Sequence, residues 1–224
     1  MTTPLLLSIQ IGLPKHRGRE DASNPMERPW LSGIFKEPVQ GPIWLGRTNL
    51  VGDGQADLKH HGGPDRAILG YAAEHYLVWR KELQRPELAY GSFGENFTLA
   101  GLTEESVCIG DTYTLGEVRI QVSQPRMPCW KLARRLGIKD ITARVHQKVW
   151  GGWYFRVLTE GYVEQNLPLA LLDRPFPQWT VTRAYNVMDE REEDPQASAE
   201  LATCSLLSVD WRRYLLERVL AREA

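Results

Sequence analysis

The feature that most constrains this chain is a series of short apolar segments separated by glycine-rich turns. Residues 112–115 and 118–122 alternate apolar with polar side chains on either side of Gly116-Glu117, and residues 5–11 open the series. Alternation with a period of two is typical of strands that bury one face, and glycine marks the turns between them. These signals continue to about residue 163. The sequence therefore predicts a β-rich α+β protein.

Helical patterns interrupt the strands and then replace them. The predicted helices cover residues 73–83, 130–136, 140–150, 182–189, 195–203 and 209–221. Residues 166–177 contain three prolines and no helical spacing, which is typical of a connecting segment. We therefore predict a first domain over residues 1–165, a linker over residues 166–177 and a small all-helical domain over residues 178–224.

Composition excludes several classes of protein. Of the 224 residues, 42% are hydrophobic and 25% charged, as in soluble globular proteins. The formal net charge of −1 gives no electrostatic basis for broad nucleic-acid binding. Three scattered cysteines argue against a disulfide framework and for a reducing compartment, and no apolar run is long enough to cross a bilayer. We expect a cytoplasmic protein that binds neither nucleic acid nor membrane.

The clearest chemical signal is the segment Gln124-Pro125-Arg126-Met127-Pro128-Cys129. It lies between a predicted strand and a predicted helix, so Cys129 should lie close to a helix N-terminus, where unpaired N–H groups and the helix dipole favour negative charge. Arg126 and Lys131 add positive charge. Such surroundings favour the thiolate, which is both a nucleophile and a soft metal ligand. The alternative interpretation is a small buried residue beneath a turn.

A second segment, residues 57–66, concentrates ionisable groups before Gly62-Gly63-Pro64. His60 and His61 are adjacent, and on extended backbone adjacent side chains point to opposite sides. They are therefore poor joint ligands for one zinc ion. More plausible is that one of them faces a pocket and transfers protons, for which histidine has a suitable pKa. The alternative is a loop whose histidines bond backbone carbonyls.

Two further features are weaker. Residues 91–97 place an acid and an amide between glycines, so Asn96 can bond a polar ring or a phosphate, or simply stabilise a turn. Lys36 precedes Glu37-Pro38 and is either an anion contact from a loop or half of a solvated ion pair.

Three motifs together resemble one family. They are Gly52-Asp53-Gly54-Gln55-Ala56-Asp57 running into Lys59-His60-His61-Gly62-Gly63-Pro64-Asp65, then Gly94-Glu95-Asn96-Phe97, and then Gln124-Pro125-Arg126-Met127-Pro128-Cys129. In this order they resemble the MOSC family, in its YiiM-like branch. The resemblance implies a strongly curved or barrel-like mixed sheet followed by a three-helix domain. It also implies a molybdenum–pterin cofactor and the two-electron reduction of N-hydroxylated compounds, such as N-hydroxylated purine base analogues, as a detoxification.

The resemblance implies that Cys129 binds the metal. Cations and backbone N–H groups would hold the pterin and its phosphate. The cofactor-binding residues that we expect are Lys36, Lys59, Arg66, Phe93, Gly94, Glu95, Asn96 and Arg126. His60 or His61, with Asp65 as the orienting carboxylate, is the predicted proton relay and completes the catalytic set with Cys129.

Electrons would have to come from outside, since the chain has no flavin, haem or iron–sulfur signature. We expect an external electron-donor protein, such as a flavin reductase, and a small-molecule substrate, and we leave a homodimer open. Pyridoxal phosphate is not expected, because the aminotransferase-like region of true cofactor sulfurases is lacking.

Two other functions remain open from the sequence. One is a binding or carrier module, in which Cys129 holds the cofactor or a persulfide without turnover. The other is a metal-free hydrolase or transferase that uses Cys129 and one of the paired histidines.

Overall fold

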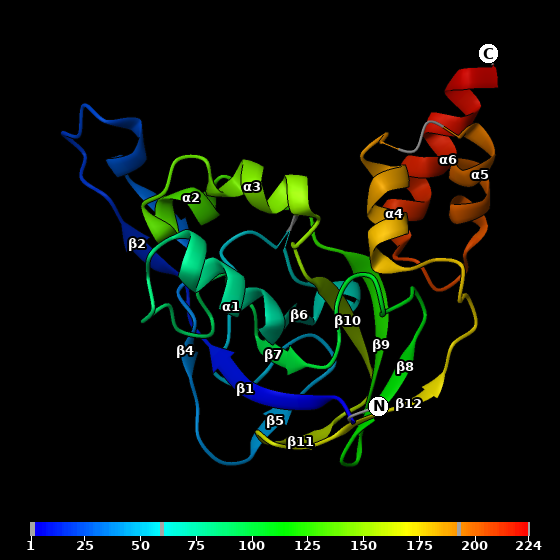
Figure 1. Cartoon of the computed structure of the whole chain (residues 1–224), viewed down its shortest axis with the longest axis horizontal. Helices are drawn as coiled ribbons and strands as arrows, with labels where there is room; N and C mark the ends of the chain where they lie inside the picture. The colour runs from blue at the N-terminus through cyan, green and yellow to red at the C-terminus, as the bar shows by residue number, and fades with distance from the viewer. Residues whose placement is uncertain (1–2, 59–60, 192–193, 224) are drawn as a thin grey trace.

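The computed structural model describes residues 3–58, 61–191 and 194–223. Within these residues, eight strands form one curled sheet in the order β12-β8-β9-β10-β6-β7-β1-β4 (Figure 1). The strands are β1 (Leu5–Ile11), β4 (Glu37–Pro38), β6 (Ile68–Ala72), β7 (Phe97–Ala100), β8 (Thr112–Leu115), β9 (Val118–Pro125), β10 (Trp153–Thr159) and β12 (Leu169–Asp173). Neighbouring strands run antiparallel, apart from the parallel pair β6 and β7. The sheet is mixed and curls into a half-barrel, which confirms the predicted fold class.

Two smaller pairs of strands accompany the main sheet. They are β2 (Lys15–Arg17) with β3 (Trp30–Ser32), and β5 (Ile43–Leu45) with β11 (Gly161–Val163). The helices are α1 (Ala73–Glu82), α2 (Lys131–Leu136), α3 (Ile141–Lys148), α4 (Val181–Met188), α5 (Pro195–Thr203) and α6 (Val209–Glu223), with short 3₁₀ turns η1 (Pro25–Glu27) and η2 (Pro64–Arg66). Each predicted helix therefore exists, with its bounds shifted by only a few residues.

Local sequence explains several of these boundaries. Helix α2 ends at Gly137, which adopts the left-handed conformation that glycine permits. Thr180 begins α4 by accepting a hydrogen bond from the backbone N–H of Arg183. Asp140 precedes α3 as predicted, but its side chain makes no capping hydrogen bond. Central strand β6 is buried at all five positions, because both of its faces are covered.

The predicted linker contains an unexpected strand. Leu169–Asp173 form β12, which pairs with β8 at one end of the main sheet. Prolines 168, 175 and 177 flank this strand and do not interrupt it. Counting prolines therefore does not reveal that the residues between them can form backbone hydrogen bonds with a neighbouring strand. The division of the chain into two domains stays a prediction.

Two hydrophobic clusters hold these layers together. One joins the concave sheet to the C-terminal helices, and includes Val122, Phe155, Trp211 and Leu215. The other lies between the sheet and helices α1, α2 and α3, and is dominated by aromatic residues such as Tyr71 and Trp79. The second cluster fixes the segment that carries Cys129, because Leu132 of α2 is buried in it.

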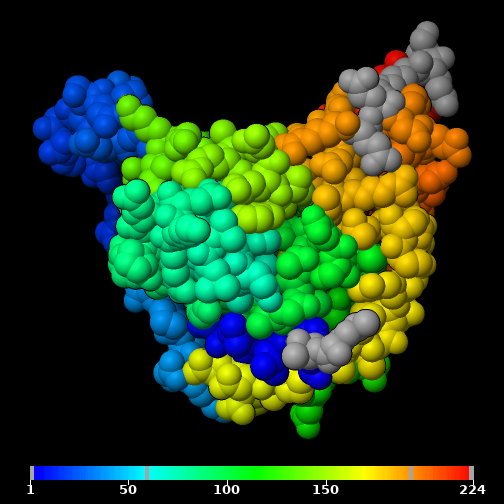
Figure 2. Space-filling model, viewed as in Figure 1, coloured from blue at the N-terminus to red at the C-terminus, as the bar shows by residue number. Residues whose placement is uncertain are grey.

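The surface has two projections. Figure 2 shows the β2–β3 region and helices α4–α6 rising from the same side of the molecule, with α2 and α3 between them. Within the described residues, no helix combines the length and the apolar character that crossing a membrane requires.

Because Leu215 lies in the cluster shared with the sheet, we expect Leu215→Ala to lower the free energy of unfolding by about 2–5 kcal/mol. Unfolding should stay a single transition when followed in urea by both far-UV circular dichroism and tryptophan fluorescence. The matched control is Leu216→Ala, which removes an exposed neighbour and should change stability by less than about 0.5 kcal/mol. Helices that melt separately, before the sheet, would contradict the shared core.

Candidate functional site

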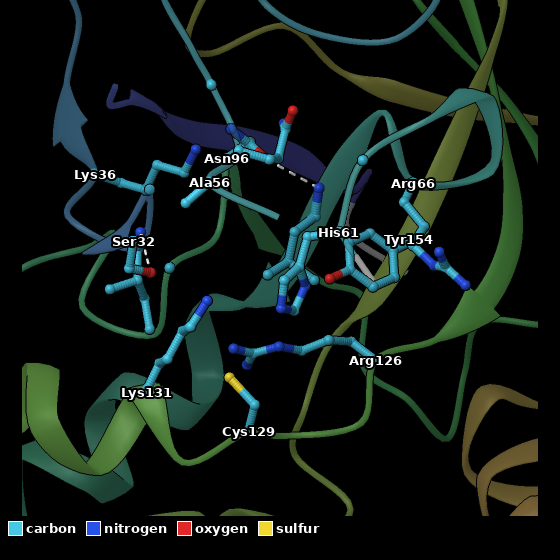
Figure 3. A pocket seen from close by; sticks show the side chains of 17 residues that line it. Ser32, Lys36, Ala56, His61, Arg66, Asn96, Arg126, Cys129, Lys131 and Tyr154 are labelled. Atoms are coloured by element: carbon cyan, nitrogen blue, oxygen red, sulfur yellow. Dashed lines mark hydrogen bonds between the residues drawn. The ribbon is translucent and has the colours of Figure 1, made fainter. Parts of the chain in front are cut away.

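A pocket of about 610 Å³, open solvent included, lies where four segments of the chain meet. They are the loops after β3 and before η2, the turn before β7, and the segment from β9 into α2 (Figure 3). The predicted site residues that line the pocket are Lys36, His61, Arg66, Gly94, Asn96, Arg126 and Cys129. Lys59 and His60 lie outside the described residues, so their predicted roles stay predictions.

Cys129 lies half-buried in the turn between β9 and α2, two residues before the helix begins, as the prolines predicted. Its backbone carbonyl accepts hydrogen bonds from Leu132 N at 3.1 Å and from Thr142 Oγ1 at 3.3 Å. These bonds fix the backbone of the turn. The thiol points into the pocket beside Arg126 and Lys131 (Figure 3).

The charge of the lining is one-sided. Lys36, Arg66, Arg126 and Lys131 line the pocket, and no aspartate or glutamate is among the described lining residues. Cations that converge in a partly closed space favour an anionic ligand, and arginine suits phosphate in particular. The pocket is therefore a candidate anion site with a sulfur atom at its wall.

Arg126 is held by the backbone of the two residues that precede β10. Its N–H donates to the Gly152 carbonyl at 3.0 Å, and Nη1 donates to the Gly151 carbonyl at 3.4 Å. The side chain is buried, so its charge acts in a medium that screens it less than water does.

Lys36 is paired inside the protein. Its Nζ bonds the Asp53 carboxylate, and burial lowers the pKa of Lys36 although Asp53 opposes that shift. Asp53 also accepts from the Gly12 N–H at 2.8 Å and from Asn96 Nδ2 at 2.9 Å. Lys36 therefore brings its charge to the pocket wall together with a counter-ion.

Asn96 lines the pocket, yet its amide already serves the fold. Oδ1 accepts from Leu69 N at 3.2 Å, while Nδ2 donates to Asp53 and to the Gln10 carbonyl at 3.2 Å. Asn96 thus ties β1, β6 and the loop of Asp53 together. Its predicted bond to a ligand would need one of these contacts to be shared.

His61 is the described member of the histidine pair, and it lines the pocket. Burial, together with the positive charges of Lys131, Arg126 and Arg66, lowers the pKa of His61 to about 4, although Asp57 opposes the shift. At neutral pH the imidazole is therefore uncharged. A ring with so low a pKa is a weak base at neutral pH, so the predicted role of His61 in proton transfer stays a prediction.

Asp65 does not line the pocket, and its predicted role as the carboxylate that orients a histidine stays a prediction. Its Oδ1 bonds Arg156 Nε at 2.9 Å, and its Oδ2 accepts from Val209 N at 3.1 Å, at the start of α6. The next residue, Arg66, reaches the pocket and bonds Asp210 at 2.8 Å. Asp65 thus links the pocket loop to the C-terminal helices.

Glu95 and Phe93 also lie away from the lining. The fully buried Glu95 accepts from Tyr76 Oη at 2.5 Å, Gly91 N at 2.7 Å and Phe93 N at 3.2 Å. The ring of Phe93 stacks on Tyr71 in the aromatic cluster, with centroids 4.8 Å apart. Both residues form the turn that presents Gly94, and neither contacts the pocket.

Sequence reasoning missed some of the lining. The sequence analysis used Lys131 only as a source of positive charge near Cys129, and did not predict that it lines the pocket. Its position two residues after Cys129 is the signal that could have identified it as a pocket residue. Tyr154 lines the pocket because β10 pairs with β9, which places it opposite Gln124. No local signal marks Tyr154, since only the pairing of the strands brings it there.

The described residues by themselves offer few ligands to a metal ion. Among the described residues, no group of three or more histidine, cysteine, aspartate or glutamate side chains is placed to hold one. A metal at Cys129 would therefore have to bring most of its ligands from a non-protein group.

We expect His61 to titrate with a midpoint near pH 4 by NMR, and Lys131→Met to raise that midpoint because one positive charge is removed. Between about pH 4 and the model-peptide value of 6.5, the unfolded chain binds a proton at His61 that the folded chain does not. The free energy of unfolding should therefore fall as the pH drops through this window. A midpoint near 6.5 in the wild-type protein would contradict this picture.

We also expect inorganic phosphate to raise the melting temperature, because a ligand that binds only the folded state stabilises it. Lys131→Met should reduce the rise, since it removes a lining cation. Lys139→Met, at an exposed position just after α2, is the matched control and should leave the rise unchanged. An equal response of both variants would place the anion elsewhere.

Comparisons with known proteins agree with this architecture. The MOSC domain profile matches residues 57–169, which include the described part of the histidine segment and the turn of Cys129. The chain is 44% identical to the uncharacterized protein YflK of Bacillus subtilis over 187 residues, covering 84% of each. It is 37% identical over 172 residues to a protein named "Reductase" from Gibberella moniliformis, covering 75% of this chain but only 30% of that longer one.

Solved structures are also similar to this fold. The crystal structure of YiiM from Geobacillus stearothermophilus superposes with a TM-score of 0.79 at 33% identity, covering 96% of this chain and 99% of that one. The resemblance seen in the sequence is confirmed by profile, sequence and structure: the chain belongs to the MOSC domain family, in its YiiM-like branch.

Proposed function

We propose that this protein reduces N-hydroxylated compounds with a molybdenum–pterin cofactor bound in the pocket. One observation carries the proposal: a half-buried thiol opens into a pocket whose charged lining is cationic. The family association with the molybdenum cofactor and the printed name of the fungal relative, "Reductase", support it.

The described residues fit such a cofactor. A single thiolate suffices for a metal that is already held by the sulfur atoms of a pterin, and Cys129 is the described cysteine in the pocket. A pterin also carries a phosphate, for which Arg126, Lys131 and Arg66 are the available partners.

In this proposal the side chains divide the work. Cys129 binds the metal, and Arg126 and Lys131 bind and orient the phosphate. When bound, the cofactor supplies a metal centre that can take up and deliver two electrons. Reduction of an N–OH group consumes two electrons and two protons, breaks the N–O bond, and yields N–H and water.

Protons and electrons need separate routes. We assign proton transfer to His61, which lines the pocket and is uncharged at neutral pH. A bound anion would offset the neighbouring positive charges and raise the pKa of His61 toward the range in which it can pass protons. Electrons come from an external protein such as a flavin reductase. The open mouth leaves the pocket accessible to both substrate and donor.

We expect protein produced in a host with an intact molybdenum pathway to contain about one molybdenum per chain by elemental analysis, as one thiolate in one pocket implies. Cys129→Ser should lose most of that metal. Cys204→Ala is the matched control, because Cys204 is buried in the cluster shared with the helices and should not affect metal content. Metal content unaffected by Cys129→Ser would contradict the proposal.

Turnover separates a reductase from a carrier. The loaded protein, supplied with a chemical reductant and an N-hydroxylated purine, should release the corresponding amine. A protein that holds molybdenum but forms no amine would support the carrier function that the sequence left open.

A further inference from the structure

Arg66 differs from other cations of the pocket in the direction of its side chain. In Figure 3 the side chain of Arg126 extends toward Cys129 and Lys131, and the side chain of Arg66 points away from them. Arg66 nevertheless lines the pocket, and its side chain is only 14% exposed. Its guanidinium therefore lies beside the candidate anion site without being directed into it.

Two bonds hold Arg66 in this direction. Its Nη2 donates to Asp210 Oδ2 at 2.8 Å, and its Nε donates to Gln124 Oε1 at 3.3 Å. Asp210 lies in the first turn of α6, so the carboxylate that pairs with Arg66 comes from the C-terminal helices. Asp210 itself does not line the pocket. The ion pair therefore orients a positive charge away from the place where an anion would bind.

Asp210 can lose Arg66 without becoming unpaired. Its second oxygen, Oδ1, accepts from Arg213 Nη2 at 2.9 Å, and 48% of its side chain is exposed to water. An ion pair with so exposed a member is weak, because water screens the charges. An anion inside a partly closed pocket is screened less, so it can compete with Asp210 for the same guanidinium.

Helix α6 keeps other contacts that do not involve Arg66. Asp65 Oδ2 accepts from Val209 N at 3.1 Å, and the other oxygen of Asp65 bonds Arg156. Trp211 and Leu215 are buried in the cluster that α6 shares with the sheet. A change of partner at Arg66 therefore requires the movement of one side chain and leaves the helix in place.

We propose that Asp210 is a positioning residue that competes with an anion in the pocket for the guanidinium of Arg66. The inference rests on the proposed function, in which the pocket holds a phosphate-bearing ligand. When the anion binds, Arg66 turns toward it and Asp210 keeps its bond to Arg213. Because the two partners of Arg66 exclude each other, α6 lowers the affinity of the pocket for the anion.

Inorganic phosphate tests the proposal on the full-length chain, produced in a host that cannot make the molybdenum cofactor. By calorimetry, Asp210→Asn should bind phosphate about two- to fivefold more tightly than the wild type, which is the range that exposed ion pairs span. The sign is informative, because loss of a merely structural residue would weaken binding or leave it unchanged. Asp210→Glu keeps the carboxylate and should bind phosphate as the wild type does.

Two further variants separate this effect from a general change of charge. Glu217→Gln is the matched control, since it removes the same charge from an exposed position further along α6 and should leave phosphate affinity unchanged. The second comparison starts from Arg66→Met. In that background Asp210→Asn should have no effect on phosphate affinity, because the side chain through which Asp210 acts has been removed.

The results distinguish this inference from the proposed function. If the loaded protein reduces no N-hydroxylated compound, but Asp210→Asn still tightens phosphate binding only when Arg66 is present, the proposed function fails and the inference stands. Unchanged or weaker binding in Asp210→Asn, an equal effect of Glu217→Gln, or an effect that persists in Arg66→Met overturns the inference. A wild-type chain that binds no phosphate overturns it as well.

Discussion

The backbone contact between Arg126 and the Gly151-Gly152 pair holds the pocket together. It continues the pairing of β9 with β10 past the end of both strands, and it fixes the turn that carries Cys129. A Cβ atom on Gly151 would lie 2.2 Å from the Arg126 carbonyl, and one on Gly152 would lie 2.2 Å from the Gly70 carbonyl. Only glycine permits three backbones to approach this closely. The buried Glu104 strengthens the contact, because its carboxylate accepts from Gly152 N at 2.9 Å and from His75 at 2.7 Å.

The charge of the pocket follows from which ionisable side chains the fold brings to its lining. Cations predominate in the pocket lining because the carboxylates that pair with two of them lie outside the described lining: Asp53 bonds Lys36, and Asp210 bonds Arg66. The same positive charges, added to burial, keep His61 uncharged. An anionic ligand would relieve the repulsion among the cations, which is the physical basis for proposing a phosphate-bearing ligand.

The C-terminal helices are part of the support for the site. Asp65 accepts from the first N–H of α6, and Arg66 reaches from the pocket to Asp210 of the same helix. Ser208 N donates to the Ser123 carbonyl of β9 at 2.9 Å, next to Gln124. The helices therefore hold β9 and the η2 turn in a fixed relation, in addition to sharing a hydrophobic cluster with the sheet.

The sequence by itself determined the type and approximate position of most elements, because alternation, helical spacing, prolines and glycines are local signals. It also identified Cys129, Arg126, Arg66 and His61 as candidate site residues, since they lie in short motifs rich in charge and turn residues, and all four line the pocket.

Tertiary structure decided what local signals cannot specify. Gly151-Gly152 follow the predicted helix over residues 140–150, and their tightest constraint is the approach of the backbone at Arg126 and Gly70, which the sequence does not reveal. Glu95 read as a ligand contact, but its burial among backbone N–H groups makes it part of the scaffold. Likewise, the flanking prolines led us to predict a linker where β12 lies. This segment forms a strand because it pairs with the edge of β8. In each case the deciding interaction joins residues far apart in the sequence, and only the folded chain brings such partners together.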